Sequence, residues 1–181
     1  MSGFDVDALV ADCVDALGEP DPRRAVRELL ARTVRDPAGV ADRLRPETAG
    51  ITVLHNTAEL TVIDVVWAPG MEIFAHDHRM WAAIAVYAGR EDNAFFARDD
   101  GQVRAAGGVT LAAGDVRVLG ADAVHAVANP GSGPTGAIHV YGGDFVRQPR
   151  SQWRPPLMAE EPYDATLVAE TFAEANAGWR R

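Results

Sequence analysis

Residues 69–89 read PGMEIFAHDHRMWAAIAVYAG, and this stretch places His76 and His78 one residue apart inside a largely apolar run. In a β-strand, side chains two residues apart point to the same side of the sheet, so both imidazoles would face one point while Asp77 faces away. Two converging imidazoles favour a divalent ion of the first transition row. The alternative is a pair of solvated or hydrogen-bonded histidines on a strand.

The residues around this pair have the pattern of antiparallel β structure. Residues 50–70 form two β-branched runs about a polar turn at Asn56 and Thr57, and later short apolar runs alternate with Gly, Pro, Asn and Asp. The stretch DDGQ at 99–102 predicts a hairpin turn. This pattern predicts a mainly β sandwich or barrel.

The two ends of the chain have a different pattern. Residues 1–48 predict a helical segment, with Asp21 as an N-cap and Pro22 at the first helical position. Residues 148–181 predict a tail with a short closing helix. No repeat or interdomain linker interrupts the 181 residues, so we expect one domain over 1–181 with its β core at 50–147.

The composition excludes several classes of function. The 26 acidic against 17 basic residues argue against nucleic-acid binding, and the absence of lysine excludes Schiff-base chemistry. Cys13, the single cysteine, excludes an internal disulfide or a multi-cysteine metal site, and we expect it to pack as a small apolar residue. No signal pattern and no apolar run near the ~20 residues of a membrane span occurs, which predicts a cytoplasmic protein without membrane contact.

The spacing of the histidines resembles that of the cupin superfamily. Gly70, His76, His78 and Gly89 stand as in the first cupin motif, although the glutamate usual after the second histidine is absent, since Ala82 and Ala83 hold those places.

A second cupin motif is matched by Gly114, His125 and Asn129, with Gly120 and Asp122 in place of its usual Pro and Gly. The resemblance implies a double-stranded β-helix, a jelly-roll barrel preceded here by the helical segment. It also implies that His76, His78 and His125 are metal ligands, with Asn129 positioned near His125.

A three-histidine set without a carboxylate resembles the thiol dioxygenases of the cysteine dioxygenase type. The stretch IHVYGGDF at 138–145 is similar to the His-x-Tyr element of that branch, which implies catalytic roles for His139 and Tyr141 beside an Fe(II) site. The alternative for this stretch is an ordinary core strand. The implied reaction adds O₂ to a small thiol and gives a sulfinate.

Three departures from that branch concern the substrate. Its serine two residues before the histidine is Ala137 here, and the cysteine that some members crosslink to the tyrosine falls near Ala83. Its early-strand arginine has no clear counterpart, and only His55 lies in that region. We therefore expect a small substrate other than plain cysteine, with Arg79, Phe74 and His55 as candidate contacts.

Two further classes of function stay open. Three histidines with an open position also suit a cupin of another reaction class, a non-thiol oxygenase, isomerase or hydrolytic enzyme with Zn, Mn or Ni. A non-catalytic small-ligand sensor is less favoured, because no DNA-binding module accompanies the β core. Cupins often pair through sheet faces, which makes a homodimer a possible assembly, although no sequence pattern identifies such a face.

Overall fold

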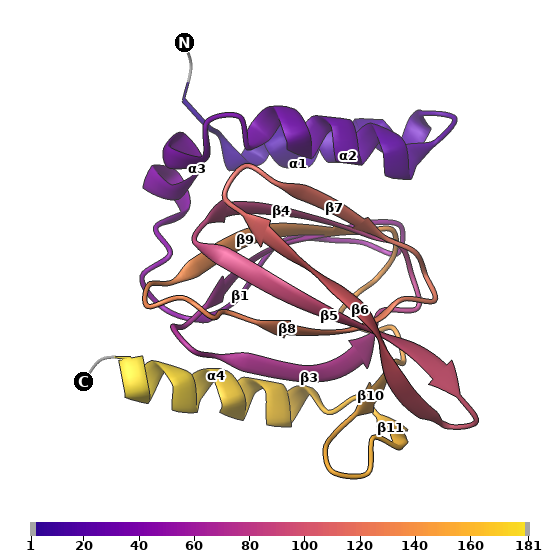
Figure 1. The fold of residues 1–181 in the computed structure, drawn as a ribbon. Helices are drawn as coiled ribbons and strands as arrows, with labels where there is room; N and C mark the ends of the chain where they lie inside the picture. The colour runs from indigo at the N-terminus through magenta and orange to yellow at the C-terminus, as the bar shows by residue number, and fades with distance from the viewer. Residues whose placement is uncertain (1–2, 180–181) are drawn as a thin grey trace.

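In the computed structural model, which describes residues 3–179, strands form two antiparallel sheets that enclose a common interior (Figure 1). The first sheet has five strands in the order β1-β2-β9-β4-β7. Their bounds are Gly50–Asn56 (β1), Thr61–Trp67 (β2), Thr135–Tyr141 (β9), Ala82–Ala88 (β4) and Val116–Leu119 (β7).

The second sheet has six strands in the order β11-β10-β3-β8-β5-β6. Their bounds are Glu160–Pro162 (β11), Ser151–Trp153 (β10), Glu72–Asp77 (β3), Val124–Ala128 (β8), Arg90–Asp99 (β5) and Gln102–Ala112 (β6). The β5–β6 hairpin turns at residues 99–102, as its DDGQ stretch predicts. The cupin double-stranded β-helix expected from the sequence, mainly β and preceded by helices, is confirmed.

The N-terminal helices cover the outer face of the first sheet (Figure 1). They are α1 (Val6–Asp15), a 3₁₀ turn η1 (Ala16–Gly18), α2 (Pro22–Thr33) and α3 (Pro37–Leu44). Each α-helix begins at an aspartate whose side chain accepts a backbone N–H three residues on, and the predicted cap, Asp21, accepts from Arg24 at 3.0 Å. Proline at the first position of α2 and α3 adds a preset φ.

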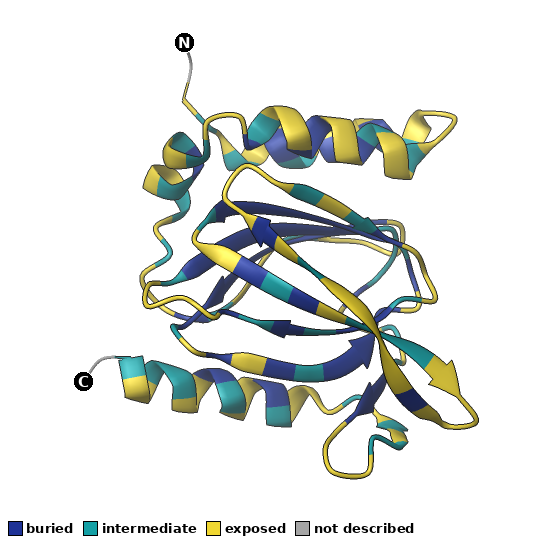
Figure 2. Cartoon of the chain, viewed as in Figure 1, coloured by how far each residue is buried: buried dark blue, intermediate teal, exposed yellow. Residues whose placement is uncertain are grey.

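The C-terminal helix α4 (Ala165–Trp179), drawn at the lower edge of Figure 1, is tied through Asn176 to Ala49, just before β1. It has 15 residues, and is longer than the short helix predicted from the sequence. Val168 and Phe172 are its buried residues, and the Phe172 ring stacks on Trp67 of β2 with centroids 5.5 Å apart. Apolar contact thus attaches α4 to the barrel, while its remaining face is exposed (Figure 2).

The central strand β9 is buried along its whole length because both of its faces are covered (Figure 2). Ile138 and Val140 pack in the cluster formed with the N-terminal helices, whereas Ala137 and Tyr141 belong to the interior cluster. Since side chains alternate along a strand, His139 also faces the interior. The period of two therefore brings His139 and Tyr141 to the same side.

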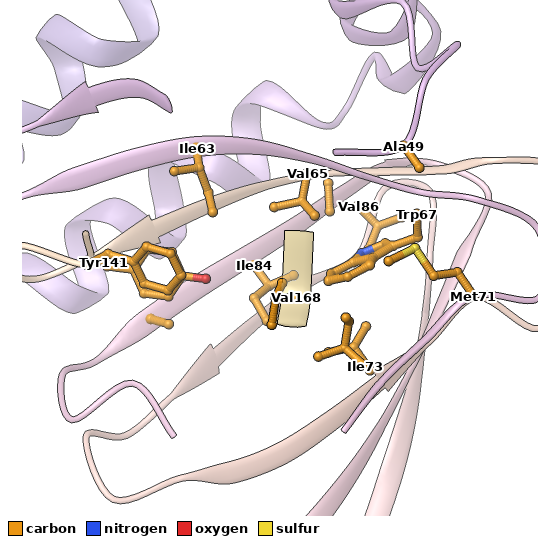
Figure 3. Close-up of a cluster of buried hydrophobic side chains, with 14 of the residues drawn as sticks. Ala49, Ile63, Val65, Trp67, Met71, Ile73, Ile84, Val86, Tyr141 and Val168 are labelled. Carbon is orange, nitrogen blue, oxygen red and sulfur yellow. The ribbon is translucent and has the colours of Figure 1, made fainter. Parts of the chain in front are cut away.

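The interior is lined by apolar side chains of both sheets. Figure 3 shows Ile63 and Val65 of β2, Ile73 of β3 and Ile84 of β4 meeting in one cluster, with the Tyr141 hydroxyl directed into the same space.

None of the helices described within residues 3–179 is long and apolar enough to cross a membrane.

Candidate metal centre

The three histidines of the two cupin-like motifs come together at one end of the interior. His76 of β3 and His125 of β8 are direct partners in the antiparallel register, and His78 follows immediately after the end of β3. The Nε2 atom of His78 lies 3.3 Å from Nε2 of His76 and 3.3 Å from Nε2 of His125. All three residues are buried, and their ligand atoms lie within 4.8 Å of one another.

This spacing fits a divalent metal ion. Two nitrogens that each lie about 2.1 Å from one ion are themselves about 3.0–3.4 Å apart. Nε2 of His78 lies at this spacing from Nε2 of both other histidines, so one ion could contact all three rings. The chain therefore combines a β-barrel of two antiparallel sheets with a buried three-histidine cluster that could hold a metal ion.

Hydrogen bonds at the far side of two rings set which nitrogen is free for the metal. The Nδ1 atom of His76 lies 3.0 Å from the backbone carbonyl oxygen of Phe74, and Nδ1 of His125 lies 2.7 Å from Oδ1 of Asn93. Both oxygens accept, so Nδ1 carries the proton and the Nε2 lone pair faces the centre. Nδ1 of His78 is buried and has no hydrogen-bond partner within residues 3–179.

Burial keeps all three rings neutral. It lowers the pKa of His76 to about 4 and, with the neighbouring histidines, lowers the pKa of His78 and His125 well below the ordinary value. Only the neutral imidazole binds a metal, so the site is ready for an ion at neutral pH.

The lowered pKa of His76 predicts a loss of stability in acid. Below pH 6.5 His76 is protonated in the unfolded chain, whereas in the folded chain it stays neutral until the pH falls to about 4. The free energy of unfolding of the metal-free protein should therefore fall by about 3 kcal/mol from this group alone as the pH drops from 7 to 4. Urea unfolding at several pH values measures this loss.

The matched variants for that titration are His76→Gln and His55→Gln. The first should lose part of the pH dependence, because the neutral amide does not titrate, and the second should retain the part that His76 contributes. An unchanged pH dependence in His76→Gln would contradict the assignment.

Tyr141 and His139 lie beside the cluster. The Tyr141 ring meets the His78 ring edge-on with centroids 5.0 Å apart, and its hydroxyl lies 3.0 Å from Nδ1 of His139. Burial raises the pKa of Tyr141 far above its ordinary value, so the phenol keeps its proton. The structure thus places the predicted pair together, next to the predicted ligands.

Glu91 of β5 is a site residue that sequence reasoning missed. Its fully buried carboxylate accepts from Nε1 of Trp67 at 2.9 Å and from Nδ2 of Asn93 at 2.8 Å, and its Oε2 lies 3.7 Å from Nε2 of His139. The stretch GREDN suggests surface charge, yet the alternation along β5 turns Glu91 and Asn93 inward and leaves Arg90 exposed. The alternation along residues 90–93 is therefore the sequence pattern from which the inward positions of Glu91 and Asn93 could have been predicted.

Asn129 takes a different place from the one expected. Its amide donates to the carbonyl oxygens of Trp67, Ala68 and Gly133, which ties the loop after β8 to the end of β2. The residue that orients His125 is Asn93.

Arg79, a candidate substrate contact in the sequence, is not among the described residues that line the inner cavity. A φ of +55° turns the chain after His78, and the guanidinium reaches Asp77 at 3.2 Å, Ser151 at 2.8 Å and Glu160 at 3.1 Å. Asp77 points away from the histidines, as the period of two predicts, and also pairs with Arg98. This ionic cluster closes the outer side of β3.

Phe74 and His55 are likewise absent from the cavity lining within the described residues. The Phe74 ring packs against the interior apolar cluster, and only its carbonyl serves the site, through His76. His55 lies on β1, whose register shifts between Val53 and His55.

Two adjoining cavities lead to the histidines. The inner one, ≈ 30 Å³, is lined by the three histidines, His139 and Tyr141 together with apolar residues, and the outer one has a volume of ≈ 380 Å³. The two cavities share five lining residues, which are Ile51, Phe145, Tyr163, Val168 and Phe172. The outer cavity is therefore a vestibule of the metal site, covered in part by α4.

Among residues 3–179, Arg150 is the one charged residue that lines the vestibule. Its guanidinium carbon lies 4.0 Å from the Phe145 ring centroid and 3.9 Å from that of Tyr163, and its buried Nη1 has no hydrogen-bond partner within residues 3–179. In the sequence nothing distinguishes it from Arg147 or Arg154 nearby. Only the fold brings this cation next to the histidines.

The sequence matches no protein-family model and no curated protein. Among solved structures, BH2720 from Bacillus halodurans is 18% identical, with 72% of this chain and 90% of that chain covered and a TM-score of 0.53. At this identity the likeness shows the fold alone.

Two further structures are similar at lower scores. A cupin with a double-stranded β-helix from Methanocaldococcus jannaschii is 13% identical, covering 55% of this chain and 85% of its own, with a TM-score of 0.45. Oxalate decarboxylase from Bacillus subtilis is 21% identical over 54% of this chain, with a TM-score of 0.45, and the match spans only 26% of the decarboxylase.

Proposed function

We propose that the protein is an Fe(II)-dependent dioxygenase that adds O₂ to a small thiol bearing a carboxylate and forms a sulfinate. The observation that carries the proposal is the set of three buried, neutral histidines beside a phenol that a fourth histidine holds in place. No carboxylate belongs to the cluster within residues 3–179.

The neutral ligand set favours an anionic substrate group. His76, His78 and His125 would hold Fe(II), which would supply the O₂ chemistry and a positive charge that attracts a thiolate. Because three imidazoles contribute no negative charge, a thiolate is needed to offset the charge of the ion, and its binding should release a proton. The surrounding apolar interior excludes water, which strengthens this charge interaction.

Tyr141 supplies a hydroxyl at the edge of the inner cavity. Its ring is packed against His78 and stacked on Phe145 with centroids 4.2 Å apart, and its hydroxyl is anchored on His139. The phenol therefore stays protonated and fixed in direction. Such a hydroxyl can share a hydrogen bond with the reacting atoms at a fixed position.

Arg150 supplies the support for a carboxylate on the substrate. An arginine with a buried, unsatisfied N–H is costly, and a bidentate carboxylate would satisfy it. Its stacking on Phe145 and Tyr163 fixes the guanidinium plane, so little side-chain entropy is lost on binding. The small inner cavity favours a short chain between sulfur and carboxylate, as in 3-mercaptopropionate.

O₂ consumption tests the reaction class. The anaerobically purified protein would be loaded with Fe(II) and mixed with cysteine, cysteamine or 3-mercaptopropionate, with His76→Ala as the blank. We expect thiol-dependent uptake, fastest with 3-mercaptopropionate, that disappears in the variant. Stoichiometric metal without uptake for any thiol would contradict the proposal and favour a zinc or manganese enzyme.

The Arg150→Met variant tests the carboxylate contact. Loss of a charge-assisted hydrogen bond of about 2 kcal/mol should raise KM for 3-mercaptopropionate about 30-fold and leave KM for cysteamine, which lacks a carboxylate, nearly unchanged. Arg154→Met is the control, since Arg154 pairs with Glu161 at 2.9 Å on the surface. Equal effects on both thiols would contradict the role of Arg150.

A further inference from the structure

Glu91 connects the two halves of the site. Its Oε2 lies 3.7 Å from Nε2 of His139, and its Oε1 accepts from the Asn93 amide, whose own oxygen lies 2.7 Å from Nδ1 of His125. One carboxylate thus faces the histidine that holds Tyr141 and, through one amide, a histidine of the metal cluster. Glu91 is fully buried, and burying a carboxylate costs free energy unless hydrogen bonds and nearby charges offset the loss of water.

The carboxylate decides where the proton of His139 lies. At 3.7 Å its oxygen is beyond hydrogen-bond distance from Nε2 but near enough for a charge interaction. A lone pair on Nε2 would be repelled, whereas an Nε2–H is attracted. Nδ1 is then free to accept a hydrogen bond from the Tyr141 hydroxyl.

The same carboxylate decides how the Asn93 amide is turned. Because Oε1 only accepts, the NH₂ group of Asn93 must face Glu91, and its carbonyl oxygen must face His125. His125 then carries its proton on Nδ1 and presents the Nε2 lone pair to the centre. If the Asn93 amide were rotated, its NH₂ group would face Nδ1 of His125. The ring would then carry its proton on Nε2, the nitrogen that faces the centre of the cluster.

The carboxylate is charged in this setting. Burial alone would raise the pKa of Glu91, yet His139, Asn93 and Trp67 together hold it below its ordinary value.

We propose that Glu91 is a positioning residue that fixes the proton positions of His139 and His125 together, through direct charge on one and through Asn93 on the other. It gives this chain a Glu91–His139–Tyr141 relay where the resembled branch has a serine and this chain has Ala137. The benefit of this arrangement for catalysis rests on the proposed function. The proton positions themselves can be measured without substrate.

Nitrogen NMR of the histidine rings in the metal-free protein at neutral pH tests it directly. Single His→Gln variants assign the signals. We expect the wild-type protein to show a proton on Nε2 of His139 and on Nδ1 of His125. A His139 ring protonated on Nδ1 alone, or a His125 ring protonated on Nε2 alone, would overturn the proposal without any variant of Glu91.

The Glu91→Gln variant adds a second readout, the affinity for Zn²⁺ alone measured by titration calorimetry. A glutamine must turn its NH₂ toward either Asn93 or Trp67, both donors, so one contact is lost whichever way it lies. We expect a changed proton position in at least one ring and an affinity about 10- to 100-fold weaker. Unchanged proton positions and unchanged affinity would overturn the proposal.

Trp67→Phe is the matched control. It removes the Trp67 hydrogen bond to Glu91 but leaves the carboxylate, its hydrogen bond from Asn93 and its contact with His139, so both proton positions should be those of the wild type. The same change in the control as in Glu91→Gln would show a general structural effect and overturn the specific role. Neither thiol nor O₂ enters these measurements, so failure of the proposed reaction is detected separately.

Discussion

The His78→Ala variant should lose both metal binding and thiol-dependent O₂ consumption. His78 has the central position in the cluster, because its Nε2 lies 3.3 Å from Nε2 of each of the other two histidines. Loss of one of three protein ligands removes on the order of a third of a typical metal-binding free energy, about 4 kcal/mol, or about 1000-fold in affinity. Metal analysis and an oxygen electrode measure the two effects.

His55→Ala is the control for this variant. It makes the same substitution on β1, outside the cluster, and should leave metal content and O₂ consumption at wild-type levels. Retention of stoichiometric metal by His78→Ala would contradict the three-histidine site.

The Tyr141→Phe variant should lower kcat about 100-fold while its metal affinity stays within about twofold of the wild type. The substitution keeps the ring that packs on His78 and Phe145 and removes only the hydroxyl that His139 holds. A positioned hydroxyl that hydrogen-bonds reacting atoms typically contributes a factor of this size or more. Stopped-flow O₂ consumption gives kcat, and calorimetry gives the metal affinity.

Tyr87→Phe controls for the loss of a buried hydroxyl. Tyr87 is buried in β4 and donates to Asp64 at 2.7 Å, on the helix-covered side of the first sheet. Both variants leave a buried partner unsatisfied, and each should lose about 1–3 kcal/mol of stability. Only Tyr141→Phe should lose activity, and an equal loss in both would assign the effect to stability.

The features that follow from local pattern are predictable from the sequence. Alternation along residues 72–78 and 135–141 places His76 with His78 and His139 with Tyr141, and the structure shows each pair on one side. Asp21 and Pro22 predict the start of α2, and DDGQ predicts the hairpin. In each case neighbouring residues along the chain determine the geometry.

The features that depend on residues distant in sequence are not predictable in this way. Arg150 reaches the site only because the segment before β10 passes the open end of the barrel, where Phe145 and Tyr163 stack on it. Alternation turns Glu91 inward, but its contact with His139 joins strands of two different sheets, which no local pattern shows. Arg79, placed near the site by its sequence neighbours, is turned away by a left-handed backbone conformation.

The central claim is tested most directly with isotopically labelled oxygen. The Fe(II)-loaded protein would turn over 3-mercaptopropionate under ¹⁸O₂, and mass spectrometry would follow the product. The account predicts a sulfinate in which both new oxygen atoms come from the same labelled gas, and none in the His76→Ala variant. A protein with stoichiometric Fe(II) that yields no labelled sulfinate would contradict it.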